Sequence, residues 1–340
     1  MTTPLAALVE CRLPPERSKA LFALVAVRPE LLAPAPMVSR AVMAQALNMA
    51  LLDDLLTRVP NAQAYADDCR REGRRIVHDH GAMRTVALEG MGGLPAGDSA
   101  LLRILDPLGY RLAGLYPLER LKMTGRSYAQ ADYPEDVAQF FISELHPDRF
   151  SPAFQAAVAR TTASSRDPLS EEAKAVLNRF AREGEATLEE AVAILGVLVS
   201  AFDRQHAPPR LDDYETLIAE SAEMAWIATE GNAFNHATDR VADVEAVAAA
   251  QRALGRPMKA EVEVAREGRV RQTAFLAARV SRPFVLEGAV VERTVPGSFY
   301  EFIARLPQTD PATGKTALDL AFDSVNAQGI FKMTQPGSRA

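Results

Sequence analysis

Residues 75–88, RIVHDHGAMRTVAL, mark the point at which the sequence changes from a helical to a strand pattern. Upstream, residues 39–59 (SRAVMAQALNMALLDDLLTRV) carry apolar side chains every three or four positions, begin with Ser39 as a helix N-cap and stop at Pro60. This spacing predicts a helix over 39–59, and a second helix is expected over 62–73. Within 75–88 the period shortens and β-branched and apolar residues accumulate, which predicts a strand.

The rest of the chain repeats one order of elements. After the strand at 75–88 the pattern predicts a short helix and then three strands, at 99–105, 109–116, 121–130 and 138–145. Residues 151–229 have a helical pattern throughout. A strand, a helix and three more strands are then expected, at 234–241, 243–255, 260–266, 271–280 and 298–306. The order β-α-β-β-β therefore occurs twice, once on each side of a helical segment.

This organisation predicts an α+β protein built from two β-α-β-β-β modules. The expected divisions are an N-terminal helical segment, a first module, a helical insertion that roofs the site, and a second module with the C-terminal tail, over 1–74, 75–150, 151–229 and 230–340. We expect these parts to form one integrated unit.

Two pairs of similar short segments support a duplicated module. In HGAMRTV and HATDRV a histidine precedes an arginine by four residues, which aligns His80 with His236 and Arg84 with Arg240. FFISELHP also resembles FYEFIARLP, which makes Glu144 the expected counterpart of Glu301.

Composition and charge exclude several classes of function. The net charge of −6 is spread along the 340 residues without a basic stripe, so a nucleic-acid partner is not expected. The two cysteines have no metal-type spacing, as in a reducing compartment. The N-terminus has no signal-peptide pattern, and no apolar run approaches the roughly 18 residues that span a bilayer. We expect a cytoplasmic protein with no membrane partner.

The histidines are few enough to be weighed one by one. On a strand, alternate side chains share a face, so His78, His80 and Arg84 are expected to point the same way. The aligned His236 would lie on the matching strand of the second module. His78 remains an alternative to His80 as a metal ligand, and His206, in a polar, proline-rich connector, is expected at the surface.

A carboxylate would complete a metal site formed with histidines of the two modules. Glu301 lies in the apolar strand SFYEFI, where burying a charge is costly unless it is paired or bound to a metal. Glu144 is its main competitor, and an edge-strand glutamate facing water is the simpler alternative. Two imidazoles and one carboxylate on one face of Fe(II) leave adjacent positions for a chelating substrate and dioxygen. Zn, Ni or Co can occupy the same donor set.

The motifs HGAMRTV, SELHPDRFS, GNAFNHATDRV, GSFYEFIAR and VNAQGIF together resemble the 2-oxoadipate dioxygenase/decarboxylase family, the D-2-hydroxyglutarate synthases, within the vicinal oxygen chelate superfamily. The resemblance covers about residues 39–331. It implies that the two modules form one curved sheet around a metal site and that His80, His236 and Glu301 hold the metal. It also implies that Arg84 binds a substrate carboxylate and that the tail near Val325 and Asn326 lines the site.

The resemblance implies an Fe(II)-dependent enzyme that uses dioxygen to decarboxylate a 2-oxo acid, with 2-oxoadipate giving 2-hydroxyglutarate and CO2. The chain departs from the family in being shorter than its better-known bacterial members, and Asn326 stands where a small hydroxyl residue is expected. A glyoxalase-type isomerase or lyase, favoured by a fourth ligand such as Glu144, is the first alternative. A binding protein of the same fold without catalysis is the second.

Overall fold

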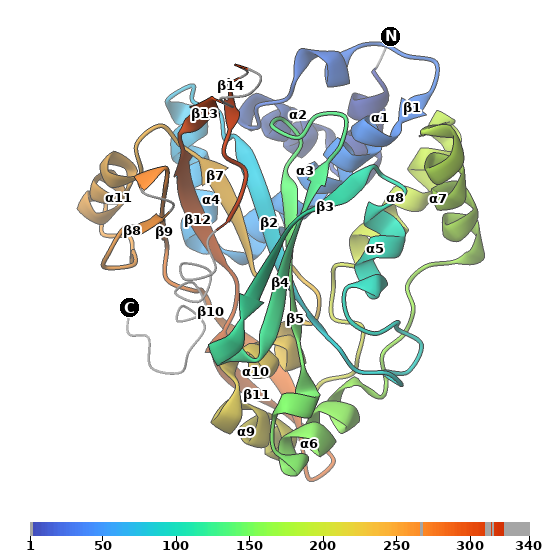
Figure 1. Cartoon of the computed structure of the whole chain (residues 1–340), viewed down its shortest axis with the longest axis vertical. Helices are drawn as coiled ribbons and strands as arrows, with labels where there is room; N and C mark the ends of the chain where they lie inside the picture. Colours follow the sequence, from blue (N-terminus) through green and yellow to red (C-terminus); the bar gives the residue numbers. More distant parts are fainter. Residues whose placement is uncertain (1–2, 266–267, 310–313, 315, 323–340) are drawn as a thin grey trace.

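The computed structural model describes residues 3–265, 268–309, 314 and 316–322. An eight-stranded curved sheet runs through the molecule (Figure 1). Its strands, in spatial order, are β3 (Tyr110–Leu118), β4 (Met123–Gln130), β5 (Gln139–Leu145), β2 (His78–Val86), β7 (His236–Arg240), β12 (Phe299–Arg305), β9 (Val270–Ala274) and β8 (Glu263–Ala265). The fold is α+β, as the sequence predicted.

The sheet consists of two similar halves that meet between β2 and β7. These central strands are antiparallel, whereas β2 pairs in parallel with β5 and β7 pairs in parallel with β12. Each half has its first strand at the centre, followed outward by its fourth, third and second strands. Gly81 pairs with Ala237, so the register relates His80 to His236 about this central pair. The duplicated β-α-β-β-β order is confirmed, with α5 (Ser99–Leu105) and α11 (Val244–Ala253) as the module helices.

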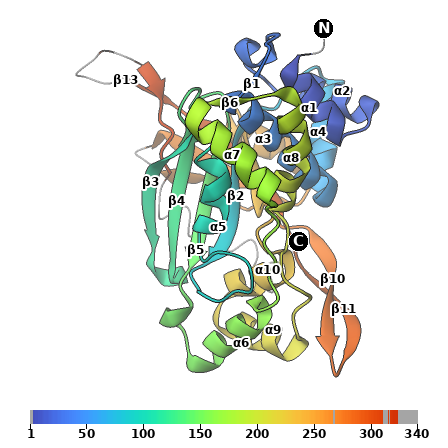
Figure 2. The same cartoon turned by 90° about the vertical axis from the view of Figure 1, so that its right-hand side faces the viewer.

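One hairpin was not predicted from the sequence. The segment 271–280, expected as one strand, divides between β9 and β10 (Arg279–Leu286), and β10 pairs with β11 (Ala289–Pro296). A two-residue turn at Glu287 and Gly288, with φ of 50° and 83°, joins them in the conformation that hairpin turns favour. The hairpin lies outside the main sheet, beside α9 (Figure 2).

Helices at the N-terminus cover one face of the sheet. They are α1 (Pro4–Arg12), α2 (Pro15–Leu24), α3 (Arg40–Arg58) and α4 (Pro60–Arg71). The hydroxyl of Ser39 caps α3 by accepting a hydrogen bond from the backbone N–H of Val42, as expected for this residue type. The apolar side of α3 packs in one core with sheet residues such as Met83 and Phe302. Side chains on the opposite face of the sheet are left to form the site.

The helical segment between the modules divides into two groups. Its helices are α6 (Pro152–Thr162), α7 (Glu171–Glu183), α8 (Leu188–Ser200), α9 (Leu211–Glu220) and α10 (Ala222–Glu230). Helix α8 packs with α7 against α1 and α3, whereas α6, α9 and α10 pack together at the other end of the molecule (Figure 1). Helix α10 contacts β2. Of the helical segment that was expected to roof the site, α10 therefore reaches the sheet. The division of the chain into an N-terminal segment, two modules and an insertion stays a prediction.

The environment of His206 differs from the expectation. Its side chain is buried, with Nδ1 2.9 Å from the carbonyl oxygen of Ala207 and Nε2 3.3 Å from that of Ile227. The surface prediction was wrong because α10, which is close in space and not in sequence, covers this connector. Among the helices of the described residues, none has the length and apolarity that crossing a bilayer requires.

Candidate metal centre

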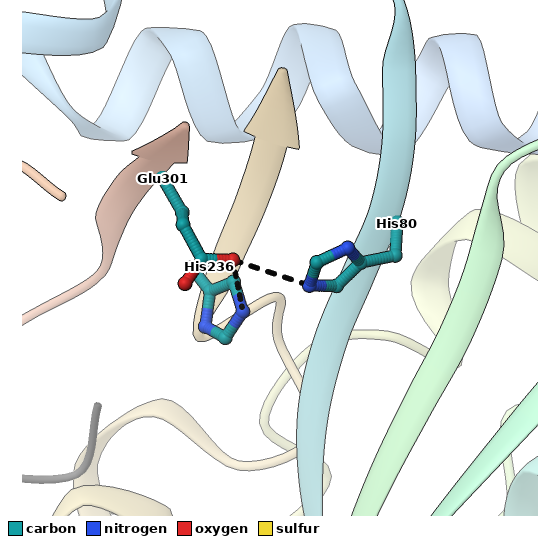
Figure 3. Close-up of side chains that lie close together, drawn as sticks. All are labelled: His80, His236 and Glu301. Atoms are coloured by element: carbon teal, nitrogen blue, oxygen red, sulfur yellow. Dashed lines mark ion pairs between the residues drawn. The ribbon is translucent and has the colours of Figure 1, made fainter. Parts of the chain in front are cut away.

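Three buried side chains from neighbouring strands point toward one another on the open face of the sheet (Figure 3). His80 comes from β2, His236 from β7 and Glu301 from β12. One possible ligand atom of each lies within 4.8 Å of those of the other two. Oε2 of Glu301 is 3.3 Å from Nε2 of His80 and 3.6 Å from Nε2 of His236. The structure thus brings together the three residues that the sequence singled out.

Strand register explains this convergence. His80 lies opposite Thr238 on β7, and Glu301 lies opposite the same threonine from β12. The Thr238 hydroxyl donates a 2.7 Å hydrogen bond to Oε2 of Glu301 and lies 3.1 Å from Nε2 of His80. Sequence reasoning missed Thr238, although its place two residues after His236 on one strand face could have revealed it.

The pKa values of these three side chains bear on whether they can act as metal ligands. Burial lowers the pKa of His236 to about 3, so its imidazole is neutral at physiological pH. Burial alone would also lower the pKa of His80, but hydrogen bonds to Asp79 and Glu301 raise it. For Glu301, burial opposes ionisation, whereas His236, His80 and Thr238 hold the pKa of its carboxyl below the usual value.

The residues fit a bound divalent metal. Among the described residues, Oε1 of Glu301 has no hydrogen-bond partner, although it is buried, and such an atom is costly to leave unpaired. Two imidazole nitrogens and a carboxylate oxygen are the donors of the open, three-residue sites that bind non-haem Fe(II). These three residues could therefore hold a metal.

His78 does not belong to this cluster. Asp239 pairs with His78 and Thr238 pairs with His80, so Asp79 is an extra residue in β2 and forms a bulge. The bulge breaks the alternation, and the His78 ring lies 6.3 Å from Phe234, on the face opposite His80. The prediction that His78 and His80 share a face was wrong for this reason.

Glu144 is also excluded from the cluster. It pairs with Thr85 and faces away from the site, where its carboxylate accepts hydrogen bonds from Arg126 and from the backbone N–H of Asp98. The register makes Phe141, and not Glu144, the counterpart of Glu301. The alignment of FFISELHP with FYEFIARLP was therefore shifted.

Arg84 lies on the same face as His80, as the alternation predicted. Residues 80–86 pair with β5 without interruption, and the Arg84 side chain is 1% exposed. Its guanidinium lies 5.0 Å from the ring centroid of Trp226 on α10. Burial lowers the pKa of Arg84 to about 10, and the charge of Glu223 opposes this effect. The predicted lining residues Val325 and Asn326 lie outside the described residues.

A segment near the C-terminus covers the metal cluster. The Phe322 ring lies 4.8 Å from that of His80 and 4.9 Å from that of Phe141, and the Tyr116 hydroxyl accepts a hydrogen bond from the Phe322 N–H. Aromatic side chains thus border the cluster on the side of β3 and β5. Sequence reasoning did not identify Phe322.

Comparison with known families places this geometry in context. The family model for 2-oxoadipate dioxygenase/decarboxylase matches residues 43–333. The chain belongs to this family. Its expected membership, based on the histidine and glutamate motifs, is confirmed. A search of the curated proteins found no match.

Solved structures support the fold. A protein assigned to the glyoxalase superfamily from Ralstonia eutropha JMP134 is 53% identical, with a TM-score of 0.89, and the match covers 95% of this chain and 99% of that one. The hydroxyglutarate synthase from Oryza sativa, in complex with 2-oxoadipate, is 19% identical, with a TM-score of 0.66 and coverage of 89% and 96%. The Pseudomonas putida enzyme, also with 2-oxoadipate, is 19% identical, with a TM-score of 0.64 and coverage of 88% and 74%.

Proposed function

We propose that this protein is an Fe(II)-dependent dioxygenase that decarboxylates a 2-oxo acid, with 2-oxoadipate as the substrate. One dioxygen would be consumed for each 2-oxoadipate, giving one 2-hydroxyglutarate and one CO2, so that all atoms balance. The observation that carries the proposal is the buried cluster of His80, His236 and Glu301 in a chain of this family.

The three side chains would hold Fe(II) through Nε2 of His80, Nε2 of His236 and the Glu301 carboxylate. The iron would supply the reaction with dioxygen and bind the 2-oxo carboxylate end of the substrate. The Thr238 hydroxyl would keep the Glu301 carboxylate oriented by donating a hydrogen bond to it. Phe322 and the surrounding aromatic residues would exclude water from the reacting carbon.

Arg84 would bind the distal carboxylate of the substrate. It shares the open face of β2 with His80, and its positive charge helps to lower the pKa of His236, so the charge acts at the cluster. A guanidinium stays protonated and offers parallel N–H donors that match a carboxylate. Such a contact would fix both the length and the orientation of a dicarboxylic 2-oxo acid.

The glyoxalase-type alternative has less support. A fourth protein ligand would favour it, but the metal-binding group within the described ranges contains three residues, and Glu144 binds Arg126 and Asp98. A non-catalytic binding protein would not need a donor set that leaves open positions for dioxygen.

The decisive experiment compares metal binding and turnover in matched variants. Apoprotein is titrated with Fe(II) without oxygen, and oxygen uptake, CO2 and 2-hydroxyglutarate are then measured with 2-oxoadipate. Wild type should give the three in equal amounts. Glu301→Gln should weaken Fe(II) binding by about 100-fold or more, because losing only an outer partner of a ligand costs 10–100-fold.

Glu144→Gln is the matched control, since it changes a buried glutamate of the corresponding module that faces away from the cluster. It should retain iron affinity and product ratio. Oxygen-independent conversion of a 2-oxo acid, or of the hemithioacetal of a 2-oxo aldehyde, by wild type would support the isomerase or lyase instead. Loss of iron in Glu144→Gln with retention in Glu301→Gln would refute the ligand assignment.

A further inference from the structure

The buried carboxylate of Asp79 contacts His80 at the ring nitrogen that does not face the metal cluster. Oδ1 of Asp79 lies 2.8 Å from Nδ1 of His80, and the Asp79 side chain is 1% exposed. Neighbouring side chains on a regular strand point to opposite faces. The bulge in β2 lets Asp79 and His80 meet, because the two residues together occupy the space opposite one residue of β7.

Arg305 holds this carboxylate in place. Its Nε lies 3.1 and 3.0 Å from the two Asp79 oxygens, and its Nη2 lies 2.9 Å from Oδ1. The Arg305 side chain is 0% exposed. Nε of Arg240 lies 3.3 Å from Oδ2 of the same carboxylate. Two arginines therefore fix the buried Asp79 carboxylate in place, with one of its oxygens within hydrogen-bond distance of the His80 imidazole.

The same arginine also binds the segment that covers the cluster. Its Nη1 donates to the backbone carbonyl oxygens of Asp319 and Ala321, each at 2.9 Å. The guanidinium lies 4.9 Å from the ring centroid of Phe322, which in turn covers His80. Arg305 thus connects the carboxylate behind His80 to the segment in front of it.

The second histidine has a different partner at the corresponding position. Asn235 precedes His236 as Asp79 precedes His80, and its Oδ1 lies 3.2 Å from Nδ1 of His236. This acceptor is neutral and its contact is longer. The two halves of the sheet therefore support equivalent histidines in unequal ways, with charge behind His80 and an amide behind His236.

We infer that Asp79 is a positioning residue of the metal centre, which presents His80 through Nε2 and makes it the stronger imidazole donor, and that Arg305 fixes Asp79 and the covering segment together. The inference rests on the proposed metal site. A carboxylate that accepts the Nδ1–H of a histidine determines its tautomer and ring orientation and raises its basicity as a ligand.

Anaerobic Co(II) titration of the apoprotein tests the inference without relying on turnover. Asp79→Asn keeps the size of the side chain and reproduces the neutral acceptor of the other half. It should weaken Co(II) binding by about 10–100-fold and shift the visible absorption of the bound ion. Arg305→Met should weaken binding by about tenfold, and adding it to Asp79→Asn should cost little more, because it acts on the metal through Asp79.

Asp213→Asn is the matched control. Asp213 is a buried carboxylate with two arginine neighbours, Arg160 and Arg210, but it lies on α9 and not on the sheet. Its removal should leave the Co(II) affinity unchanged. Equal Co(II) affinity and spectrum in wild type and Asp79→Asn would overturn the inference, as would an equal loss in Asp213→Asn.

The wild-type protein provides an independent test if a variant fails to fold. With ¹⁵N-labelled histidine and Zn(II), the ring nitrogens of His80 should show a protonated Nδ1 and a metal-bound Nε2. A protonated Nε2 on His80 would overturn the inference alone. Wild type that binds neither Co(II) nor Zn(II) would instead refute the proposed function on which the inference rests.

Discussion

Gly81 follows His80 on β2, and the space beside its α-carbon is filled by the ring of Phe234. A Cβ at this position would lie 2.2 Å from Cζ, 2.4 Å from Cε2 and 2.7 Å from Cε1 of that ring, whereas ordinary contact begins at 3.4 Å. In Gly81→Ala the ring would have to move by about 1 Å. The rings of Phe140 and Phe202 lie at centroid distances of 5.9 and 6.2 Å and limit this movement.

Two effects of Gly81→Ala oppose each other. Restricting the unfolded chain stabilises the native state by about 0.4–1 kcal/mol. Overpacking in a close-packed core costs about 1–3 kcal/mol, and the aromatic residues around Phe234 favour the upper end of that range. The clash should prevail, and we expect a net loss of about 2 kcal/mol in the free energy of unfolding. Since Gly81 pairs with Ala237 between the two histidine strands, Co(II) affinity should also fall.

Urea unfolding followed by circular dichroism measures this effect in wild type, Gly81→Ala, Phe234→Leu and the double variant. Leucine lacks the Cε and Cζ atoms that the new methyl group would meet. The alanine should therefore cost less than about 1 kcal/mol in the leucine background, a coupling of at least about 1 kcal/mol. An equal cost in both backgrounds, or an unchanged midpoint in Gly81→Ala, would refute the steric explanation.

Three further predictions concern the site and its surroundings. Arg84→Lys should keep Fe(II) affinity but lower kcat/KM for 2-oxoadipate by about 30-fold, roughly 2 kcal/mol, and loss of iron together with activity would contradict the substrate role. Burial raises the pKa of Asp239 from 3.8 to about 7, so the stability that its protonated form contributes is complete below pH 3.8 and is lost as the pH rises through 7. Asp239→Asn should therefore show a smaller decline in the free energy of unfolding, measured in urea, between about pH 4 and pH 8 than wild type, by up to about 4 kcal/mol, and parallel declines would refute this. Phe322→Ala should retain Co(II) affinity but take up more oxygen than it forms 2-hydroxyglutarate, because water then reaches the cluster. Equal amounts of oxygen consumed and 2-hydroxyglutarate formed in this variant would exclude the covering role.

Much of the architecture was predictable because the relevant signals are local. Apolar periodicity located the strand with His80, the short helix after it and the helical segment between the modules. The β10–β11 hairpin escaped because its strands are largely exposed and lie outside the main sheet, so the segment carries no strong core pattern. The surface expectation for His206 failed because its cover comes from α10.

The sequence by itself narrowed the site to a few local candidates: histidines on two similar strands and a glutamate in an apolar strand, with His78 and Glu144 left open as alternatives. The resemblance to a known family selected His80, His236 and Glu301 among them. Only the tertiary structure decided which neighbours serve them. The bulge that turns His78 away and brings Asp79 to His80 depends on pairing with β7, about 160 residues later in the chain. Likewise, Arg305 reaches Asp79 across 226 positions of sequence. Side-chain alternation is a property of one strand, whereas register and bulges are set by the energy of pairing two strands, and no single segment encodes that energy.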